Sequence, residues 1–175
     1  MWHDPLWWTV LLSVAVLMEP WAMLVHARVW HGPLLWGHRS HHVRDAGKPG
    51  AQRGGSWFEL NDLFSLGHAA IAIALIATGV DGHGSVAHEL MVAVGAGMTL
   101  FGVGYFLVHD GFIHERLPLG FLARIRWFRL LRNAHRAHHG PRGGAPYGLF
   151  LGPQELRYQR ARPHLDAGRT PRRIP

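Results

Sequence analysis

Histidines dominate the chemistry that this chain can perform, because ten of its 15 histidines fall into four clusters. Two clusters have the spacing H-x4-H, two have the spacing H-x2-H-H, and the two spacings alternate along the chain. The clusters are His26 and His31; His38, His41 and His42; His109 and His114; and His135, His138 and His139. Imidazole is the commonest protein ligand for a transition metal, and one ion takes roughly four to six ligands. The sequence therefore predicts a site that holds a pair of metal ions.

The two spacings place different demands on a helix. In H-x2-H-H the positions i, i+3 and i+4 share one face of an α-helix, so the three imidazoles can point into one volume. In H-x4-H the two histidines lie about 140° apart around an ideal α-helix. They converge only where the helix ends or is distorted, as by a π-bulge, and such bulges are frequent at functional sites.

The number and type of ligands bear on the metal. All-imidazole ligation in a chain without cysteine suits iron, zinc, copper or nickel. Zinc sites usually close with about four ligands, so ten histidines exceed what two closed zinc sites need. A pair of irons with about five or six ligands each accounts for the number best. Such a cationic cluster would favour binding and reducing O2, which an enzyme needs to attack an unactivated C–H bond in a lipid.

Composition and charge indicate a membrane protein. Of the 175 residues, 48% are hydrophobic and only 17% are charged, with a formal net charge of +7. Lys and Arg are absent from residues 1–27 and 54–115, and we expect the two basic blocks at 28–53 and 116–175 to face the cytoplasm. Since no motif beyond charge supports nucleic-acid binding, the sequence predicts no nucleic-acid partner.

Three apolar stretches are long enough to cross a hydrocarbon core of about 30 Å, at residues 6–25, 63–80 and 88–108. A fourth crossing, obtained by splitting the third stretch, is the alternative. The predicted fold is an all-α integral membrane helical bundle, one membrane domain over residues 1–175, with the di-metal site on its cytoplasmic face.

The remaining segments follow from the same patterns. Cytoplasmic helices are expected at about 26–62 and 109–152, and a flexible basic tail at about 160–175. Residues 121–132 alternate apolar side chains with arginine, which predicts a basic amphipathic helix on the membrane surface. Glu19, a carboxylate within the first span, is expected to be hydrated or partnered with a ligand histidine.

The five histidines outside the clusters carry weaker predictions. We expect His68 and His88 to be hydrogen-bonded for structural reasons, and His3, His83 and His164 to be isolated and solvated.

The chain resembles the bacterial β-carotene hydroxylases of the fatty acid hydroxylase superfamily over roughly residues 18–152. The resemblance is carried by E-P-W at 19–21, H-A-R-V-W-H at 26–31, W-G-H-R-S-H-H at 36–42, E-L-N-D at 59–62, V-H-D-G-F-I-H at 108–114, A-H-R-A-H-H at 134–139 and Y-G-L-F at 147–150. The histidine pattern alone indicates only the superfamily, which includes desaturases and sterol oxidases. The E-L-N-D and V-H-D-G-F-I-H stretches narrow it to the carotenoid hydroxylases.

The resemblance implies a non-haem di-iron monooxygenase of the inner membrane. Such an enzyme inserts one atom of O2 at the 3-position of a β-ionone ring and converts β-carotene to β-cryptoxanthin and then zeaxanthin. Its electrons come from reduced ferredoxin and an NAD(P)H-dependent reductase. The ten clustered histidines match the family's ligand motifs, and Glu59, Asn61 and Asp110 match polar positions that would hydrogen-bond to ligands. Direct metal contact by Asn61 is an alternative.

Two further questions stay open at the level of sequence. The arginines beside the last two clusters would either dock an acidic ferredoxin or bind anionic lipid headgroups; they are Arg116, Arg124, Arg126, Arg129 and Arg132. The alternative function is a related di-iron oxidase acting on another lipid, such as a fatty acyl or sterol hydroxylase, a desaturase or a carotenoid ketolase. A metal transporter or haem carrier is disfavoured, because its histidines would lie inside the membrane spans.

Overall fold

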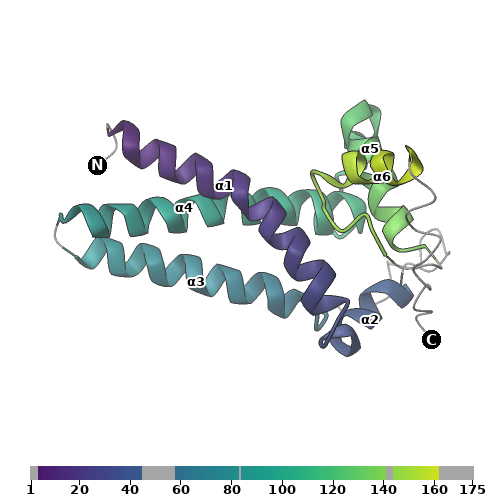
Figure 1. Cartoon of the computed structure of the whole chain (residues 1–175), viewed down its shortest axis with the longest axis horizontal. Coiled ribbons are helices and arrows are strands. Elements are labelled where there is room, and N and C mark those ends of the chain that lie inside the picture. Colours follow the sequence, from purple (N-terminus) through teal and green to yellow (C-terminus); the bar gives the residue numbers. More distant parts are fainter. Residues whose placement is uncertain (1–3, 45–57, 83, 141–143, 162–175) are drawn as a thin grey trace. The chain divides into compact units, whose positions relative to one another are not determined.

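The computed structural model describes residues 4–44, 58–82, 84–140 and 144–161. Within these ranges every regular element is a helix, which confirms the predicted all-α class (Figure 1). The chain divides into two compact units, the first made of Met1–Glu19 and Asp62–Phe106 and the second of Pro20–Asn61 and Leu107–Pro175. All ten clustered histidines belong to the second unit.

The first unit consists of long apolar helices. α3 (Asp62–Asp81) and α4 (Val86–Phe106) run antiparallel and pack side by side, and a short turn joins them (Figure 1). α1 (Pro5–Val25) contributes its residues up to Glu19. Its Trp7 and Leu11 form a buried cluster with Val92 and Ala93 of α4, so this unit has an apolar core of its own.

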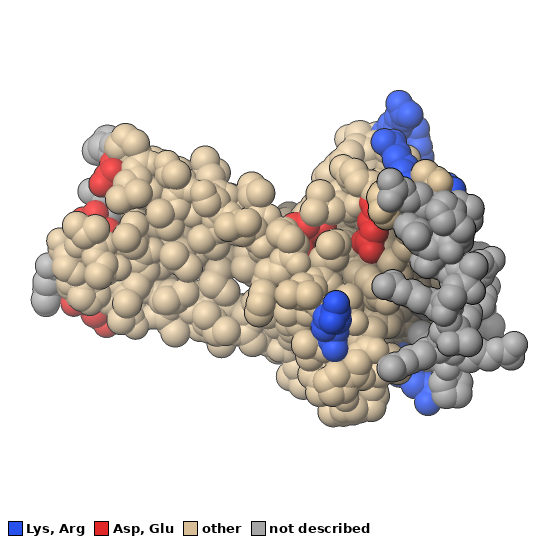
Figure 2. All heavy atoms as spheres, viewed as in Figure 1, with Lys and Arg blue, Asp and Glu red and all other residues tan. Residues whose placement is uncertain are grey.

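Three helical segments are long and apolar enough to cross a membrane: Pro5–Trp30, Asp62–Asp81 and Val86–Ile113. Each contains one of the three predicted spans, and the first and third extend five residues further, so they include His26 and His109. The described part of the chain contains no fourth segment of this kind. Val16 and Ile73 are 71% and 66% exposed, and exposed aliphatic side chains suit lipid tails better than water. Figure 2 shows these helices almost free of charge, with acidic residues at the end where α3 turns into α4.

The second unit is built from shorter elements. Two π-helical turns, η1 (His26–Trp30) and η3 (Leu107–Ile113), continue α1 and α4 directly in the chain. The other elements are α2 (Leu35–Arg44), the 3-10 helix η4 (Gly120–Arg124), α5 (Arg126–His138) and α6 (Gly152–Ala161). Phe112 of η3 and Leu131 of α5 are fully buried within this part of the chain.

The single amphipathic helix predicted at 121–132 is wrong in its bounds. Ile125 has an extended backbone, with φ −88° and ψ 126°, so η4 ends before it and α5 begins after it. The Arg129 guanidinium donates hydrogen bonds to the carbonyl oxygens of Ala123 and Arg124, at 2.9 and 2.8 Å. These bonds satisfy carbonyls at the end of η4 that a continuous helix would have used internally, which stabilises the break.

Some of the remaining predictions are confirmed, and others concern residues outside the described ranges. His68 bonds through Nδ1 to the Phe64 carbonyl at 3.0 Å, and His88 bonds to the Ser85 hydroxyl, which confirms their hydrogen-bonded roles. Residues 160 and 161 of the predicted tail belong to α6, and the rest of the tail lies outside the described residues. His3, His83 and His164 lie outside them too. The partner expected for Glu19 stays a prediction.

Candidate metal centre

Both H-x4-H pairs lie where the helix widens into a π-turn. The backbone N–H of His31 donates to the carbonyl of His26 at 3.0 Å, and the N–H of His114 donates to the carbonyl of His109 at 2.9 Å. This i to i+5 pattern brings residues five apart onto one side of the helix. The ring centroids of His26 and His31 are 5.0 Å apart, and those of His109 and His114 are 4.5 Å apart. The predicted helix distortion is confirmed.

The two H-x2-H-H clusters lie on regular helices, as their spacing predicts. His38, His41 and His42 are buried on α2, and the Nε2 atoms of His38 and His42 are 3.1 Å apart. His135 and His138 are buried in the last turns of α5. His139 follows directly as the C-cap and keeps a helical conformation, with φ −74° and ψ −1°.

Nine of the ten clustered histidines form two adjoining groups, and the tenth, His139, lies beside both. His26, His31, His38, His42 and His138 form the first group, and His41, His109, His114 and His135 form the second. Within each group one ligand nitrogen per residue lies within 4.8 Å of all the others. The His139 ring stacks on His42 with centroids 4.4 Å apart and lies 4.4 Å from the ring of His135, so it sits between the groups.

In the first group the outer nitrogens face oxygen acceptors. Nδ1 of His26 lies 2.9 Å from the Tyr147 carbonyl, and Nδ1 of His38 lies 2.7 Å from the Asn61 side-chain oxygen. Nδ1 of His138 bonds to the Gly144 carbonyl. A carbonyl oxygen can only accept, so each Nδ1 carries the proton and each Nε2 keeps a lone pair.

The lone pairs of the first group point at one another. Nε2 of His26 and Nε2 of His38 are 3.0 Å apart, and neither carries a proton to share when its Nδ1 donates outward. Two imidazole lone pairs at this distance repel unless a cation lies between them. The donor set therefore fits a transition-metal ion, and the outward hydrogen bonds fix each ring in the orientation that a ligand needs.

In the second group the outer nitrogens face carboxylates. Nδ1 of His41 lies 3.4 Å from Glu59, and Nδ1 of His109 lies 3.2 Å from Asp110. Both carboxylates also form an ion pair with Arg116. Glu59, Asn61 and Asp110 thus lie against ligand histidines, as the hypothesis for these three residues requires.

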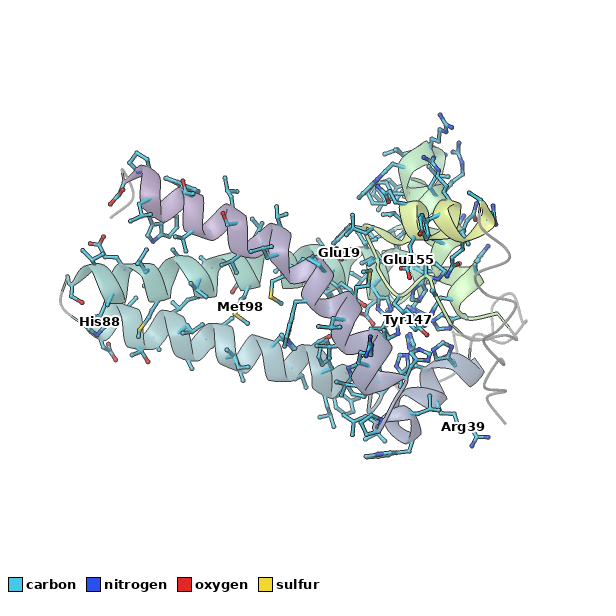
Figure 3. The ribbon with its side chains drawn as sticks, viewed as in Figure 1. Glu19, Arg39, His88, Met98, Tyr147 and Glu155 are labelled. Atoms are coloured by element: carbon cyan, nitrogen blue, oxygen red, sulfur yellow. The ribbon has the colours of Figure 1, made fainter. Side chains whose placement is uncertain are left out.

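The segment after α5 supports the first group through its backbone. The Glu155 carboxylate on α6 accepts the backbone N–H groups of Tyr147 and Gly148, at 2.8 and 3.2 Å, and Figure 3 shows Glu155 next to Tyr147. This holds the Tyr147 carbonyl against His26. The Tyr147 ring also lies edge-on to His31, with centroids 5.2 Å apart, so it closes one side of the group.

Comparison with known proteins decides the family. No family model and no solved structure matches the chain. The chain is 42% identical over 137 residues to the β-carotene hydroxylase of Pseudescherichia vulneris. The matched residues cover 77% of this chain and 68% of the bacterial protein. The chain belongs to the β-carotene hydroxylase family. This confirms the resemblance inferred from the histidine, E-L-N-D and V-H-D-G-F-I-H motifs.

Plant members of the β-carotene hydroxylase family are similarly close. The chloroplastic β-carotene 3-hydroxylase of Gentiana lutea is 44% identical over 151 residues, 85% of this chain and 44% of the plant protein. The chloroplastic β-carotene 3-hydroxylase 1 of Arabidopsis thaliana is 42% identical over 161 residues, 90% of this chain and 49% of the plant protein. The chain therefore spans slightly less than half the length of these plant relatives.

Three contributors to this hydroxylase-family site were missed by sequence reasoning. Backbone carbonyls at Gly144 and Tyr147 accept histidine protons, and a backbone acceptor leaves no signature in residue type. Glu155 acts through that backbone from the next helix. Arg116 was predicted to contact a partner or lipid, whereas its guanidinium pairs with Glu59 and Asp110. The one feature of the sequence that could have indicated this pairing is the position of Arg116, two residues after His114.

Burial keeps the imidazoles of this site neutral. Desolvation lowers the pKa of His31 to about 4 and, aided by the charge of His42, lowers the pKa of His38 to about 3. Desolvation and neighbouring histidines also lower the pKa of His41, His135, His138 and His139. A metal binds the neutral imidazole, so these side chains are ready to ligate near neutral pH.

We expect acid to destabilise the metal-free protein, starting near pH 6.5. Below that pH the unfolded chain protonates His31 and His38, while burial keeps both neutral in the folded state down to a pKa of about 4 and about 3. The unfolded state then binds more protons than the folded state, so the free energy of unfolding decreases as the pH is lowered through this window. Thermal unfolding of chelator-treated protein in detergent should give a lower Tm at about pH 5 than at about pH 7.5. An equal or higher Tm at the lower pH would contradict this.

Proposed function

We propose that this chain is a membrane carotenoid 3-hydroxylase, which hydroxylates the β-ionone rings of β-carotene to give β-cryptoxanthin and zeaxanthin. The observation that carries the proposal is the convergence of the ten clustered histidines: nine form two groups that could each hold a metal ion, and His139 lies beside both groups. The substrate and the 3-position come from relatives named β-carotene 3-hydroxylases, at 42% and 44% identity.

The proposed cofactor is a pair of iron ions, one for each histidine group. Nitrogens bound about 2.1 Å from an ion lie about 3.0 Å apart at a right angle and about 3.4 Å apart at a tetrahedral angle. The Nε2 atoms of His38 and His42 are 3.1 Å apart, and those of His114 and His135 are 2.9 Å apart. Other Nε2 pairs are longer, up to 3.3 Å between His109 and His114, so iron is proposed over zinc on the number of histidines, which exceeds what two closed zinc sites need.

When bound, the two irons would supply O2 activation, so that one oxygen atom enters a C–H bond and the other leaves as water with two electrons and two protons. The chain's own residues hold the rings for this task. Carbonyls and Asn61 fix the first group, and carboxylates fix the second. His38, His41 and His138 are 3% exposed or less, which keeps bulk water from the ligand nitrogens.

The substrate is proposed to reach this site from the bilayer. His26 follows α1 directly, and η3 with His109 continues α4, so each H-x4-H pair begins in the last residues of an apolar segment that could cross a membrane. A carotenoid dissolves in the hydrocarbon core and would extend its ring to these ligands. We place the protein in the inner membrane and the site on the cytoplasmic side, which the basic blocks are also expected to face. Both units are proposed to belong to one hydroxylase domain over residues 1–175.

Reduced ferredoxin, supplied by its NAD(P)H-dependent reductase, is the proposed electron donor. Of the five arginines considered for docking, Arg116 and Arg129 bind within the chain, and Arg132 lies over the Phe112 ring at 5.1 Å. Arg124 and Arg126 are exposed and remain the best candidates. If they dock ferredoxin, Arg126→Glu should lower ferredoxin-dependent turnover and its salt sensitivity with membrane insertion intact. Unchanged turnover would favour lipid headgroups as their partner.

Pigment chromatography tests the proposed reaction. Cells that make β-carotene would express the chain together with a ferredoxin and its reductase, beside cells that carry the empty vector. β-Cryptoxanthin and zeaxanthin appearing only with the chain would establish substrate and product. A ketone product would indicate a carotenoid ketolase, and unchanged β-carotene with the protein in the membrane would favour an oxidase of another lipid.

A further inference from the structure

The two histidine groups differ in the charge of the atoms that support them. The outer nitrogens of His26, His38 and His138 in the first group bond to neutral oxygens. Those of His41 and His109 in the second group face the carboxylates of Glu59 and Asp110. A carboxylate that accepts the outer proton makes the imidazole a stronger donor to its metal than a carbonyl does. The two metal positions are therefore electrostatically unequal.

One arginine holds both carboxylates of the second group. Nη1 of Arg116 lies 3.2 Å from Oδ1 of Asp110, and its Nη2 lies 3.5 Å from Oε1 of Glu59. The side chains of Glu59 and Asp110 are each 8% exposed, and that of Arg116 is 18% exposed. Two buried carboxylates would repel each other without a cation, so the guanidinium fork both neutralises them and fixes their separation.

The backbone brings Arg116 back over Asp110. Glu115 adopts the left-handed conformation, with φ 56°, immediately after His114. This ends the π-turn, and the N–H of Arg116 then donates to the carbonyl of Asp110 at 3.0 Å. The ligand His109, its partner Asp110 and the arginine that pairs with Asp110 thus lie on one short, back-folded segment.

We propose that Glu59, Arg116 and Asp110 form an ionic clamp that positions the ligands of one metal ion only, the ion of the second group. Arg116 is the positioning residue, because it pairs with both carboxylates, and these carboxylates in turn face the rings of His41 and His109. The inference rests on the proposed metal pair and deepens it. Without Arg116 the carboxylates would move apart, and His41 and His109 would lose the acceptors that orient them, whereas the first group keeps its own acceptors.

Metal binding by the full-length chain in detergent tests the clamp, with Co2+ as the probe. Metal-free protein would be dialysed against increasing Co2+, and the number of bound ions and the affinity of each would be measured. We expect two ions in the wild-type chain. In Arg116→Gln one ion should bind as before and the other about 10–100-fold more weakly, the usual cost of losing such support.

Three further variants make the result specific. Arg116→Lys keeps the charge but has a single nitrogen, so it should restore part of the lost affinity. Asp110→Asn keeps the size of the side chain and should weaken the same ion, which preserves the test if Arg116→Gln does not fold. Arg157→Gln, which changes an exposed arginine of α6, is the matched control and should bind both ions normally.

A double variant identifies which ion responds. His138→Ala removes a ligand of the first group, so the Arg116→Gln and His138→Ala changes together should leave no tightly bound ion. A double variant that still holds one ion tightly would overturn the clamp, as would Arg116→Gln weakening both ions equally or neither. A wild-type chain that binds fewer than two ions would instead contradict the metal pair itself.

Discussion

His138→Ala is expected to abolish carotenoid hydroxylation and to reduce the bound metal from two ions to one. The His138 side chain is fully buried, and its Nε2 lies 3.2 Å from Nε2 of His31. Its ring lies 4.6 Å from His26 and 4.7 Å from His42, so it stands at the centre of the first group. Removing it takes away one ligand and leaves a hole that water can enter. We expect product to fall at least about 100-fold, since losing even an outer support of a ligand costs about 10–100-fold.

His88→Ala is the matched control for this prediction. His88 lies on α4 near the turn that follows α3, as Figure 3 shows, and bonds to Ser85 rather than to a ligand histidine. The same substitution there should leave pigment conversion and metal content at wild-type levels. Chromatography of cell pigments and metal analysis of the purified variants give the two readouts. A His138→Ala chain that still makes zeaxanthin with both ions bound would remove this residue from the site.

The convergence of the clustered histidines could be predicted from sequence because helix geometry fixes it locally. Spacing alone places His38, His41 and His42 on one face of α2, whatever surrounds that helix. The H-x4-H spacing carried a sharper implication, since five residues do not close one α-helical turn. The helix therefore had to deform at each H-x4-H pair, and η1 begins at His26 while η3 contains His109.

The supports of the ligands could not be predicted in the same way. His26 bonds to the carbonyl of a residue 121 positions away, and no local pattern links the two. The break at Ile125 is local by contrast, because the Arg129 guanidinium bonds to carbonyls of η4 only five and six residues away. An alternation of arginine and apolar residues predicts helix at 121–132 and carries no information about that bond.

Gly95→Leu is expected to separate α3 from α4 and to destabilise the first unit strongly. A Cβ atom on Gly95 would lie 2.7 Å from the carbonyl oxygen of Ala72 and 2.7 Å from Cγ1 of Ile76. Backbone oxygen cannot move aside as a side chain can, so the two helices must move apart. Overpacking of this kind costs about 1–3 kcal/mol, and contact with backbone favours the upper end. Thermal unfolding in detergent should show a clearly lower Tm and a lower yield of folded protein.

Gly102→Leu is the control that separates the effect of the α3–α4 contact at Gly95 from the other effects of replacing glycine with leucine. Gly102 lies two turns further along α4, is exposed, and has no atom within 4 Å of the position that its Cβ would take. Leucine favours helix over glycine at both positions, so propensity alone would raise stability in each variant by up to about 1 kcal/mol. The difference in Tm between the two variants therefore measures the helix contact. Equal Tm values would mean that α3 and α4 do not approach as closely at Gly95 as the structure has them, whereas a fall confined to Gly95→Leu would establish that glycine is needed there for the helices to meet.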